Sequence, residues 1–254
     1  MSSKLCSVVI PVYNGAKYLR ATLESFFSQD YENKELILVD DASQDESSLI
    51  LNEVREAYPD IVRLIRNPEN RGLAQTLLSG SLAAHGEYMS VFGQDDLMFP
   101  DRLSTLVEHL EIHHASMICS NAYYLLDGEK TTQLVNSLNA PSGFIPRNRF
   151  LYNNPVIGPS ALFRKHDFER IDLSIFRFKN SIEWLHWFQY ANMDGVYYLA
   201  KPLLYYRRHA RNLTNSVFKT TEYRDYRRVV RSHILARLRP SEILLATTQK
   251  LFGR

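Results

Sequence analysis

The 254-residue chain is poor in cysteine, and it has no long hydrophobic run. Its two cysteines, Cys6 and Cys119, stand in no metal-binding spacing, which argues against a structural zinc site and favours a reducing compartment. With 45% hydrophobic and 12% aromatic residues the chain can bury a large core, which excludes collagen-like, disordered and disulfide-scaffold proteins. No stretch approaches the roughly 18 apolar residues of a spanning helix, and no signal-type segment follows Met1. We therefore expect a cytoplasmic protein.

Charge is nearly balanced but unevenly placed. The whole chain carries 30 basic and 28 acidic side chains, a net charge of +2. Residues 219–254 hold nine Lys or Arg against three Asp or Glu, a balance of +6. This basic tail is a candidate surface for an anionic partner.

Two periodicities alternate over the first hundred residues. Short apolar, β-branched runs predict buried strands at 5–12, 35–39, 61–65 and 88–92. Apolar side chains at three- and four-residue spacing predict helices at 17–29, 49–58 and 73–84, the second opened by a capping box at 43–46. This alternation predicts an α/β fold, with a Rossmann-like, mostly parallel sheet flanked by helices.

Other patterns follow residue 100. We expect a helix to about 114, a strand at 117–126, a hairpin turn at Asp127-Gly128, a long functional loop at 136–159 with a short helix near Phe150, a helix at 181–193, and short strands at 196–199 and 203–206. The chain thus divides into a nucleotide-binding half (1–99), an acceptor-binding and catalytic half of the same domain (100–215), and a basic helical tail (216–254).

The ends of the first four predicted strands carry the candidate site residues. Ligands of open α/β sheets bind beyond the carboxyl ends of the strands, near the point where strand order reverses. These ends deliver Pro11, Tyr13, Asn14, Asp40, Asp41, Arg71, Asp95 and Asp96. Acidic pairs can hold Mg²⁺ or Mn²⁺ together with phosphates, a tyrosine can pack on a base, and an arginine can pair with phosphate.

Taken singly, each residue has a simpler explanation. An Asp-Asp pair after a strand is often a turn with a helix cap, Tyr13 alone favours packing, and Arg71 alone favours a solvated charge. Agreement across four strand ends favours a nucleoside diphosphate site. The first strand is followed by neither GxGxxG nor GxxxxGK[ST], which argues against dinucleotide and P-loop sites.

Four sequence blocks carry a family resemblance. They are SVVIPVYN (7–14), LVDDAS (38–43), NRGLA (70–74) and FGQDD (92–96). Together they resemble the signature blocks of family 2 glycosyltransferases, and the similarity extends to about residue 215. It implies a GT-A fold with a smaller acceptor-side region and C-terminal helices. It also implies transfer of a sugar from a nucleotide donor, most often a UDP-sugar, to an acceptor hydroxyl with inversion.

The resemblance also assigns roles. Asp40 and Arg71 would contact the nucleobase, Asp95 ribose or metal, Asp96 the metal-bound diphosphate, and His209 the diphosphate or metal, with Mn²⁺ or Mg²⁺ as cofactor. The chain departs from the family at Gly93, where the usual Asp-x-Asp-Asp has its first acid. That departure leaves open which remaining aspartate binds the ion directly.

An inverting enzyme needs a base opposite the leaving diphosphate. Alignment on Trp187 puts Glu183 at the family's base position, where the usual Glu-Asp pair reads Ile182-Glu183. An apolar neighbour can raise the pKa of this carboxylate toward a useful range. The alternative is a helix-terminal glutamate with no catalytic task. Trp184 and Asn154 fall in the region that would hold the acceptor.

The tail favours two interpretations equally. Apolar side chains between Tyr223 and Leu238 form a stripe beside five arginines, as in a helix lying on an anionic membrane. The other interpretation is a helix packed on the domain or on a second subunit. A lipid-linked or glycan acceptor at the inner face of the cytoplasmic membrane would suit the membrane-bound helix. No nucleic-acid-binding motif accompanies the basic charge, so we do not expect a nucleic-acid partner. The alternative to an enzyme is a non-catalytic sugar-nucleotide-binding or scaffolding protein derived from one.

Overall fold

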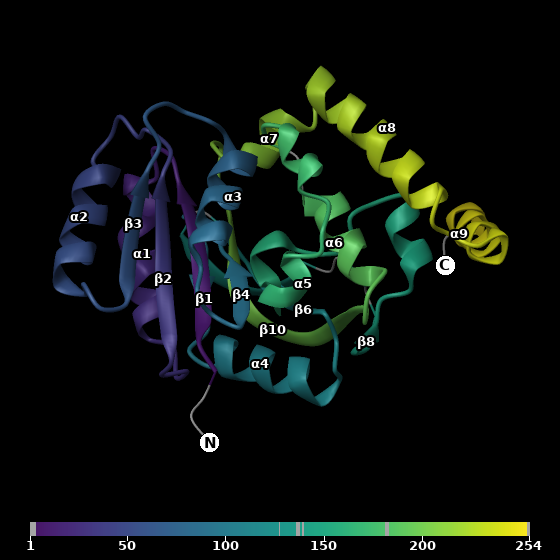
Figure 1. Ribbon diagram of the computed structural model, residues 1–254, viewed down its shortest axis with the longest axis horizontal. Helices are drawn as coiled ribbons and strands as arrows, with labels where there is room; N and C mark the ends of the chain where they lie inside the picture. Colours follow the sequence, from purple (N-terminus) through teal and green to yellow (C-terminus); the bar gives the residue numbers. More distant parts are fainter. Residues whose placement is uncertain (1–3, 127, 136–137, 139, 181–182, 253–254) are drawn as a thin grey trace.

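The computed structural model describes residues 4–126, 128–135, 138, 140–180 and 183–252. One open sheet with strand order β3-β2-β1-β4-β9-β6-β10-β5 runs through both halves of the chain (Figure 1). Strand β7 pairs with β6 and β8 pairs with β10 at its margins. Helices cover both faces, so the predicted α/β architecture is confirmed.

The first half follows the predicted alternation of strands and helices. Its elements are β1 (Cys6–Val12), α1 (Ala16–Phe27), β2 (Lys34–Asp40), α2 (Ser47–Ala57), β3 (Val62–Arg66), α3 (Leu73–Ala83) and β4 (Tyr88–Val91). All three strand pairings are parallel, as expected of strands buried on both faces. The predicted capping box is wrong, because α2 begins at Ser47 and Glu46 makes no side-chain cap.

The second half is mixed in direction. Its elements are β5 (Leu97–Met98), α4 (Arg102–Ile112), β6 (Met117–Leu126), β7 (Glu129–Leu134), β8 (Gly143–Phe144), η1 (Arg147–Leu151), η2 (Gly158–Ser160), β9 (Ala161–Arg164), α5 (Lys165–Phe168), η3 (Leu173–Arg177), α6 (Glu183–Ala191) and β10 (Val196–Arg208). Strand β9 lies antiparallel between β4 and β6, so the sheet is mainly parallel only in its first half. Asp127 and Ile182, named above for a turn and for the Ile-Glu pair, lie outside the described residues.

Strand β10 corrects the prediction of two short strands. It is continuous over 13 residues and pairs parallel with β6, with register shifts on both sides of Pro202. Proline has no N–H to donate, so it disturbs the ladder without ending the strand. Because β10 is continuous, it ends at Arg207 and Arg208, and the Arg207 amide reaches Asp96 in the loop after β4.

The tail continues through α7 (Leu213–Val217), α8 (Thr221–Leu235) and α9 (Pro240–Phe252), which lie along the second half in Figure 1. The apolar stripe of α8 is buried in the core shared with α6, through Tyr226, Val230 and Ile234. That packing corrects the expectation of a stripe available to lipid. Among the described residues no helix has the length and apolar character needed to cross a bilayer.

Candidate active site

The loop after β2 is built around two buried carboxylates. Asp40 accepts hydrogen bonds from the Ser43 amide (2.9 Å) and the Ser48 hydroxyl (2.5 Å). Asp41 accepts from the Asn67 side chain (2.7 Å) and from the amides of Arg71 and Gly72 (both 2.9 Å). The Asp41 contacts fix the turn that begins α3, while the Arg71 side chain is exposed beyond the strand ends.

The loop after β1 is tied to both neighbouring loops. Asn14 lies at a positive φ of 50° and joins the β2 loop, donating its amide to Ser43 Oγ (3.1 Å) and accepting from the Gln44 amide (2.7 Å). Tyr13 joins the β4 loop: its backbone N–H and C=O both bond the side-chain amide of Gln94, at 2.9 and 3.1 Å. The Tyr13 residue is 44% exposed and Pro11 is half-buried in β1. These contacts bring Tyr13, Asn14 and Asp40 together.

The loop after β4 presents Asp95 and Asp96. A Cβ at Gly93 would lie 2.7 Å from Asp96 Oδ2 and 3.1 Å from Asp95 Oδ1, so the two carboxylates face the space that a side chain at this position would need. An acid at position 93 does not fit with the carboxylates in these places. Burial and the neighbouring Asp95 charge raise the pKa of Asp96 well above its ordinary value.

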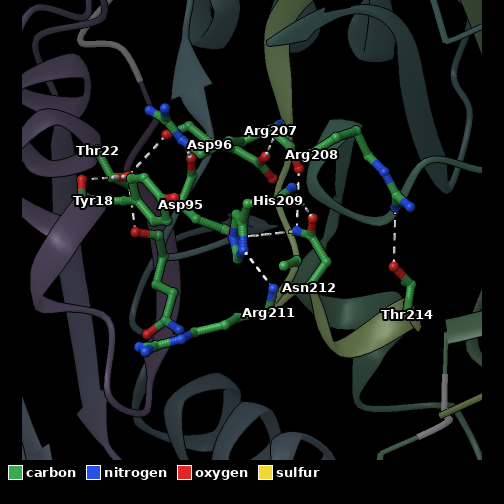
Figure 2. Close-up of polar contacts among 12 residues, drawn as sticks. Tyr18, Thr22, Asp95, Asp96, Arg207, Arg208, His209, Arg211, Asn212 and Thr214 are labelled. Carbon is green, nitrogen blue, oxygen red and sulfur yellow. Dashed lines mark hydrogen bonds and ion pairs between the residues drawn. The ribbon is translucent and has the colours of Figure 1, made fainter. Parts of the chain in front are cut away.

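Residues at the end of β10 complete this cluster (Figure 2). The Arg207 amide donates to Asp96 Oδ1 (2.8 Å), and its guanidinium donates to the Asp95 carbonyl (2.6 Å) while lying 4.4 Å from the centre of the Tyr18 ring. His209 Nε2 donates to Asp95 Oδ2 at 2.8 Å, and Asn212 donates to the same oxygen at 3.2 Å. Asp95, Asp96 and His209 are therefore brought together.

The ring nitrogens of His209 have distinct partners. Nδ1 accepts from the Arg211 amide at 3.1 Å, which puts the ring proton on Nε2, toward Asp95. In this tautomer His209 orients Asp95. To bind a cation through Nε2, the ring would have to give up the Arg211 contact. Arg208 points away, to Thr214 and Asn215 (Figure 2).

A divalent cation suits the two carboxylates, because their oxygens are hard ligands that converge at Gly93. Among the described residues no group of three Asp, Glu, His or Cys side chains is arranged to hold a metal by itself. Phosphate oxygens of a donor would have to complete such a coordination shell.

Glu183 is the first residue of α6, and its carboxyl group faces η2. A Cβ on Gly158 would lie 2.2 Å from Glu183 Oε1, so only glycine leaves this space. Burial raises the pKa of Glu183 to about 7, and its charge helps to raise the pKa of Asp96 and that of Tyr206, the latter to about 12. Glu183 and Asp96 thus belong to one electrostatic cluster.

The predicted acceptor residues fare differently. The prediction that Trp184 contacts the acceptor is wrong. Its indole is buried in the core, and its Nε1–H donates a hydrogen bond to the Phe150 carbonyl (2.7 Å). The helical spacing of α6 turns this side chain inward. Asn154 is half-buried and accepts from the Val156 amide in its own loop (3.1 Å), so it stays a candidate.

Sequence reasoning places Gln94 at the end of the fourth strand but assigns it no role, and it does not point to Tyr18 or Asn212. Gln94 occupies the variable position of the acidic block, and the spacing of Tyr18 predicts only that it belongs to the apolar face of a helix. Asn212 lies just beyond the Arg-Arg-His segment, and its amide contacts Asp95, His209 and the Arg207 carbonyl. A turn-forming asparagine after a strand is the only signal that pointed to it.

Residues 7–172, more than half of the chain, match glycosyl transferase family 2. The chain belongs to this family. The glycosyltransferase is 28% identical over 237 residues to an uncharacterized glycosyltransferase of Rickettsia prowazekii (strain Madrid E), covering 88% of this chain and 70% of the relative. It is 35% identical over 124 residues to glycosyltransferase GlyG of Streptococcus pneumoniae, covering 48% and 40%.

Two solved structures show the same fold. The first is TarS 1-349 of S. aureus in complex with UDP-GlcNAc: TM-score 0.69, 16% identity, 95% of this chain and 79% of that one. The second is the mannosyltransferase PcManGT from Pyrobaculum calidifontis in complex with GDP-Man and Mn²⁺: TM-score 0.66, 19% identity, 96% and 69%. The predicted GT-A fold is confirmed.

Proposed function

We propose that this glycosyltransferase moves a sugar from a nucleotide-sugar donor, a UDP-sugar in first place, to an acceptor hydroxyl with inversion at the anomeric carbon. The observation that carries the proposal is that Asp95 and Asp96 converge at Gly93 and are held there by Arg207 and His209, within reach of the Glu183 charge. A similar fold binds UDP-GlcNAc in TarS, which supports the donor class.

The nucleotide is assigned to the ends of the first four strands. Tyr13 offers an exposed ring to the base, and Pro11 and Asn14 shape the floor of its site. Asp40 and the exposed Arg71 side chain recognise base edges, and Asp95 is placed for the ribose or the cation.

The cofactor is assigned to Asp95 and Asp96, with His209 beside them. Mn²⁺ or Mg²⁺ bound there supplies positive charge that offsets the charge developing on the departing diphosphate. The chain itself supplies orientation: Arg207 and His209 hold the two carboxylates in place. Mn²⁺ in the PcManGT complex supports this assignment.

Glu183 is assigned as the base. One carboxylate oxygen takes the proton of the acceptor hydroxyl while the hydroxyl oxygen of the acceptor bonds to the anomeric carbon. The bond from the anomeric carbon to the diphosphate oxygen breaks in the same step, and the diphosphate leaves with its electron pair. A pKa raised by burial makes Glu183 a stronger proton acceptor than an exposed carboxylate.

The acceptor is assigned to a glycan or a lipid-linked carrier of cell-surface polysaccharide synthesis. The apolar stripe of α8 is buried, so a membrane would have to contact other side chains. The surface assigned to an anionic membrane consists of exposed arginines of α8, among them Arg224 and Arg228, and of the exposed Leu244 and Leu245 of α9. Co-sedimentation with phosphatidylglycerol vesicles, but not with phosphatidylcholine vesicles, checks this part separately.

The experiment starts with the donor. Purified protein is heated with UDP, UDP-GlcNAc, GDP or GDP-mannose, each with and without Mn²⁺. A ligand at about 100 times its Kd adds about 2.7 kcal/mol to the unfolding free energy. We expect a rise in Tm with uridine nucleotides that depends on Mn²⁺; a rise with guanosine nucleotides alone would replace the UDP assignment, and no rise with any would contradict nucleotide-sugar use.

The second step tests the base through release of UDP from UDP-GlcNAc, with water as acceptor. Glu183→Gln should lower kcat by about 10²–10⁴-fold without changing nucleotide binding. Wild-type kcat/KM should fall as pH drops below about 7, where Glu183 becomes protonated. A non-catalytic protein would bind the donor and release nothing at any pH.

Stability gives a readout independent of turnover. The folded pKa of Glu183 is about 7 against an ordinary 4.5, so the folded protein retains a proton that the unfolded chain loses. Unfolding free energy should therefore fall as pH rises from about 4.5 to about 7. Glu183→Gln should remove that part of the pH dependence; an unchanged profile would contradict the buried glutamic acid.

A further inference from the structure

Helices α6 and α8 both lie beyond residues 7–172, the segment that matches the family, and α8 contacts the start of α6, the helix that carries Glu183. The Tyr226 side chain is buried, and its hydroxyl oxygen accepts a hydrogen bond from the Leu185 amide at 2.9 Å. Leu185 is in the first turn of α6, where backbone N–H groups have no acceptor within the helix. A side chain of the tail therefore caps α6.

A second contact lies one turn earlier on the same face of α8. Glu222 Oε1 accepts hydrogen bonds from the amides of Lys179 and Asn180, the described residues just before α6. The Lys179 carbonyl in turn accepts from the Ala74 amide in the first turn of α3 (3.0 Å). Glu222 and Tyr226 are four residues apart, so one face of α8 holds the chain both before and inside the start of α6.

Glu183 has little room to move between these contacts and η2. Its carboxyl oxygen occupies the space that a side chain at position 158 would need. Tyr226 also lies close enough to Glu183 for the glutamate charge to act on its hydroxyl. Small shifts of the first turn of α6 therefore change the direction of the carboxylate.

We propose that α8 is a positioning element of the active site, in which Tyr226 and Glu222 fix the first turn of α6 and so aim Glu183 at the acceptor. This inference rests on the proposed role of Glu183 as the base. Without the Tyr226 oxygen the Leu185 amide is left buried and unpaired. The carboxylate of Glu183 is two residues earlier in the same turn, so it can turn back to accept this hydrogen bond and would then leave its working position.

The test is Tyr226→Phe, which keeps the ring and its edge-to-face contact with Phe178. The matched control is Tyr223→Phe on the same helix, since no hydrogen bond of the Tyr223 hydroxyl is found in the described part of the chain. Both are assayed in the full chain by UDP release from UDP-GlcNAc with Mn²⁺, as a function of pH.

We expect Tyr226→Phe to lower kcat about tenfold with KM for the donor nearly unchanged. A Glu183 carboxylate that accepts the Leu185 N–H is stabilised in its charged form, so the acid limb of the pH profile should move to lower pH. Tyr223→Phe should leave both unchanged. Merely structural packing would not move the pH profile.

A double-mutant cycle separates this inference from the proposed function. In a Glu183→Gln background, Tyr226→Phe should have almost no further effect on kcat, because the residue acts through Glu183. Wild-type turnover in Glu183→Gln would contradict the base assignment. Loss of turnover in Glu183→Gln, with Tyr226→Phe indistinguishable from Tyr223→Phe or with additive effects, would overturn only the positioning role.

Glu222→Gln provides a second route if Tyr226→Phe is unfolded at the assay temperature, which its Tm reveals. Glutamine keeps one acceptor oxygen and the size of the side chain, so we expect a fall in kcat of about twofold to fivefold and the same direction of pH shift. A wild-type pH profile and kcat in Glu222→Gln would contradict the proposal.

Discussion

The two Asp-Asp pairs of the chain, Asp40-Asp41 and Asp95-Asp96, each follow a buried parallel strand, yet their partners differ. The first pair accepts hydrogen bonds from its own loop, from α2, from Asn67 after β3 and from the turn before α3. The second pair is held by Arg207, His209 and Asn212, more than a hundred positions later. One pair is completed within the first half, and the other joins the two halves.

This difference separates what a carboxylate does for folding from what it does for chemistry. The carboxylate oxygens of Asp41 accept hydrogen bonds from three donors that shape a turn, so Asp41 has a structural role. Asp95 and Asp96 face one another at Gly93, where a cation and phosphate oxygens can be bound. Replacing members of each pair should therefore affect different measurements.

The largest expected effect is that of Asp95→Asn on turnover. Asparagine has nearly the shape of aspartate but removes the charge that a cation needs, so we expect kcat for UDP release to fall about 10²–10³-fold. The contact between Asp95 and His209 is partly exposed, so it should contribute no more than about 1 kcal/mol to the unfolding free energy. Kinetics and urea unfolding of the same sample check both numbers.

Asp60→Asn is the matched control, since Asp60 is exposed before β3 at the opposite end of the strands. It should leave both measurements unchanged. If Asp95→Asn lost several kcal/mol of stability and little activity, Asp95 would have a structural role like that of Asp41.

The second effect is that of Asp41→Asn on stability. One carboxylate oxygen becomes an NH₂ group that faces a backbone donor, so we expect a loss of about 2 kcal/mol in unfolding free energy. The kcat of the folded fraction should stay within a few-fold of wild type, because the hydrogen bonds of the Asp41 carboxylate go to Asn67, Arg71 and Gly72 and not to Glu183 or the second pair. Urea unfolding at fixed pH measures the first value, and donor-saturated kinetics the second. A large fall in kcat with unchanged stability would reverse the roles of the two pairs.

The same contrast explains what could be predicted from the sequence. Local patterns were enough for β1 to β4, α1 and α3, and for the acidic pairs, because strand ends follow directly from periodicity. Contacts such as Arg207 to Asp96 depend on β10 continuing through Pro202, whereas the local pattern predicts two short strands at 196–199 and 203–206. The inward turn of Trp184 and the Tyr226 cap depend on how α6 and α8 pack, and no local pattern carries that information.

The smallest expected effect is at Gln94, whose side chain joins the loop after β1 to the loop of the second pair. Gln94→Ala removes two hydrogen bonds to the Tyr13 backbone at a partly exposed position, and we expect a loss of about 1 kcal/mol. KM for the donor should rise a few-fold while kcat stays near wild type, because Tyr13 moves but Asp95 does not. Gln94→Glu should do more, since its carboxylate cannot donate to the Tyr13 carbonyl and adds a negative charge next to Asp95. If Gln94→Ala lowered kcat as much as Asp95→Asn, the loop after β1 and the second acidic pair would work as one unit. The contrast between the two acidic pairs would then have to include this loop.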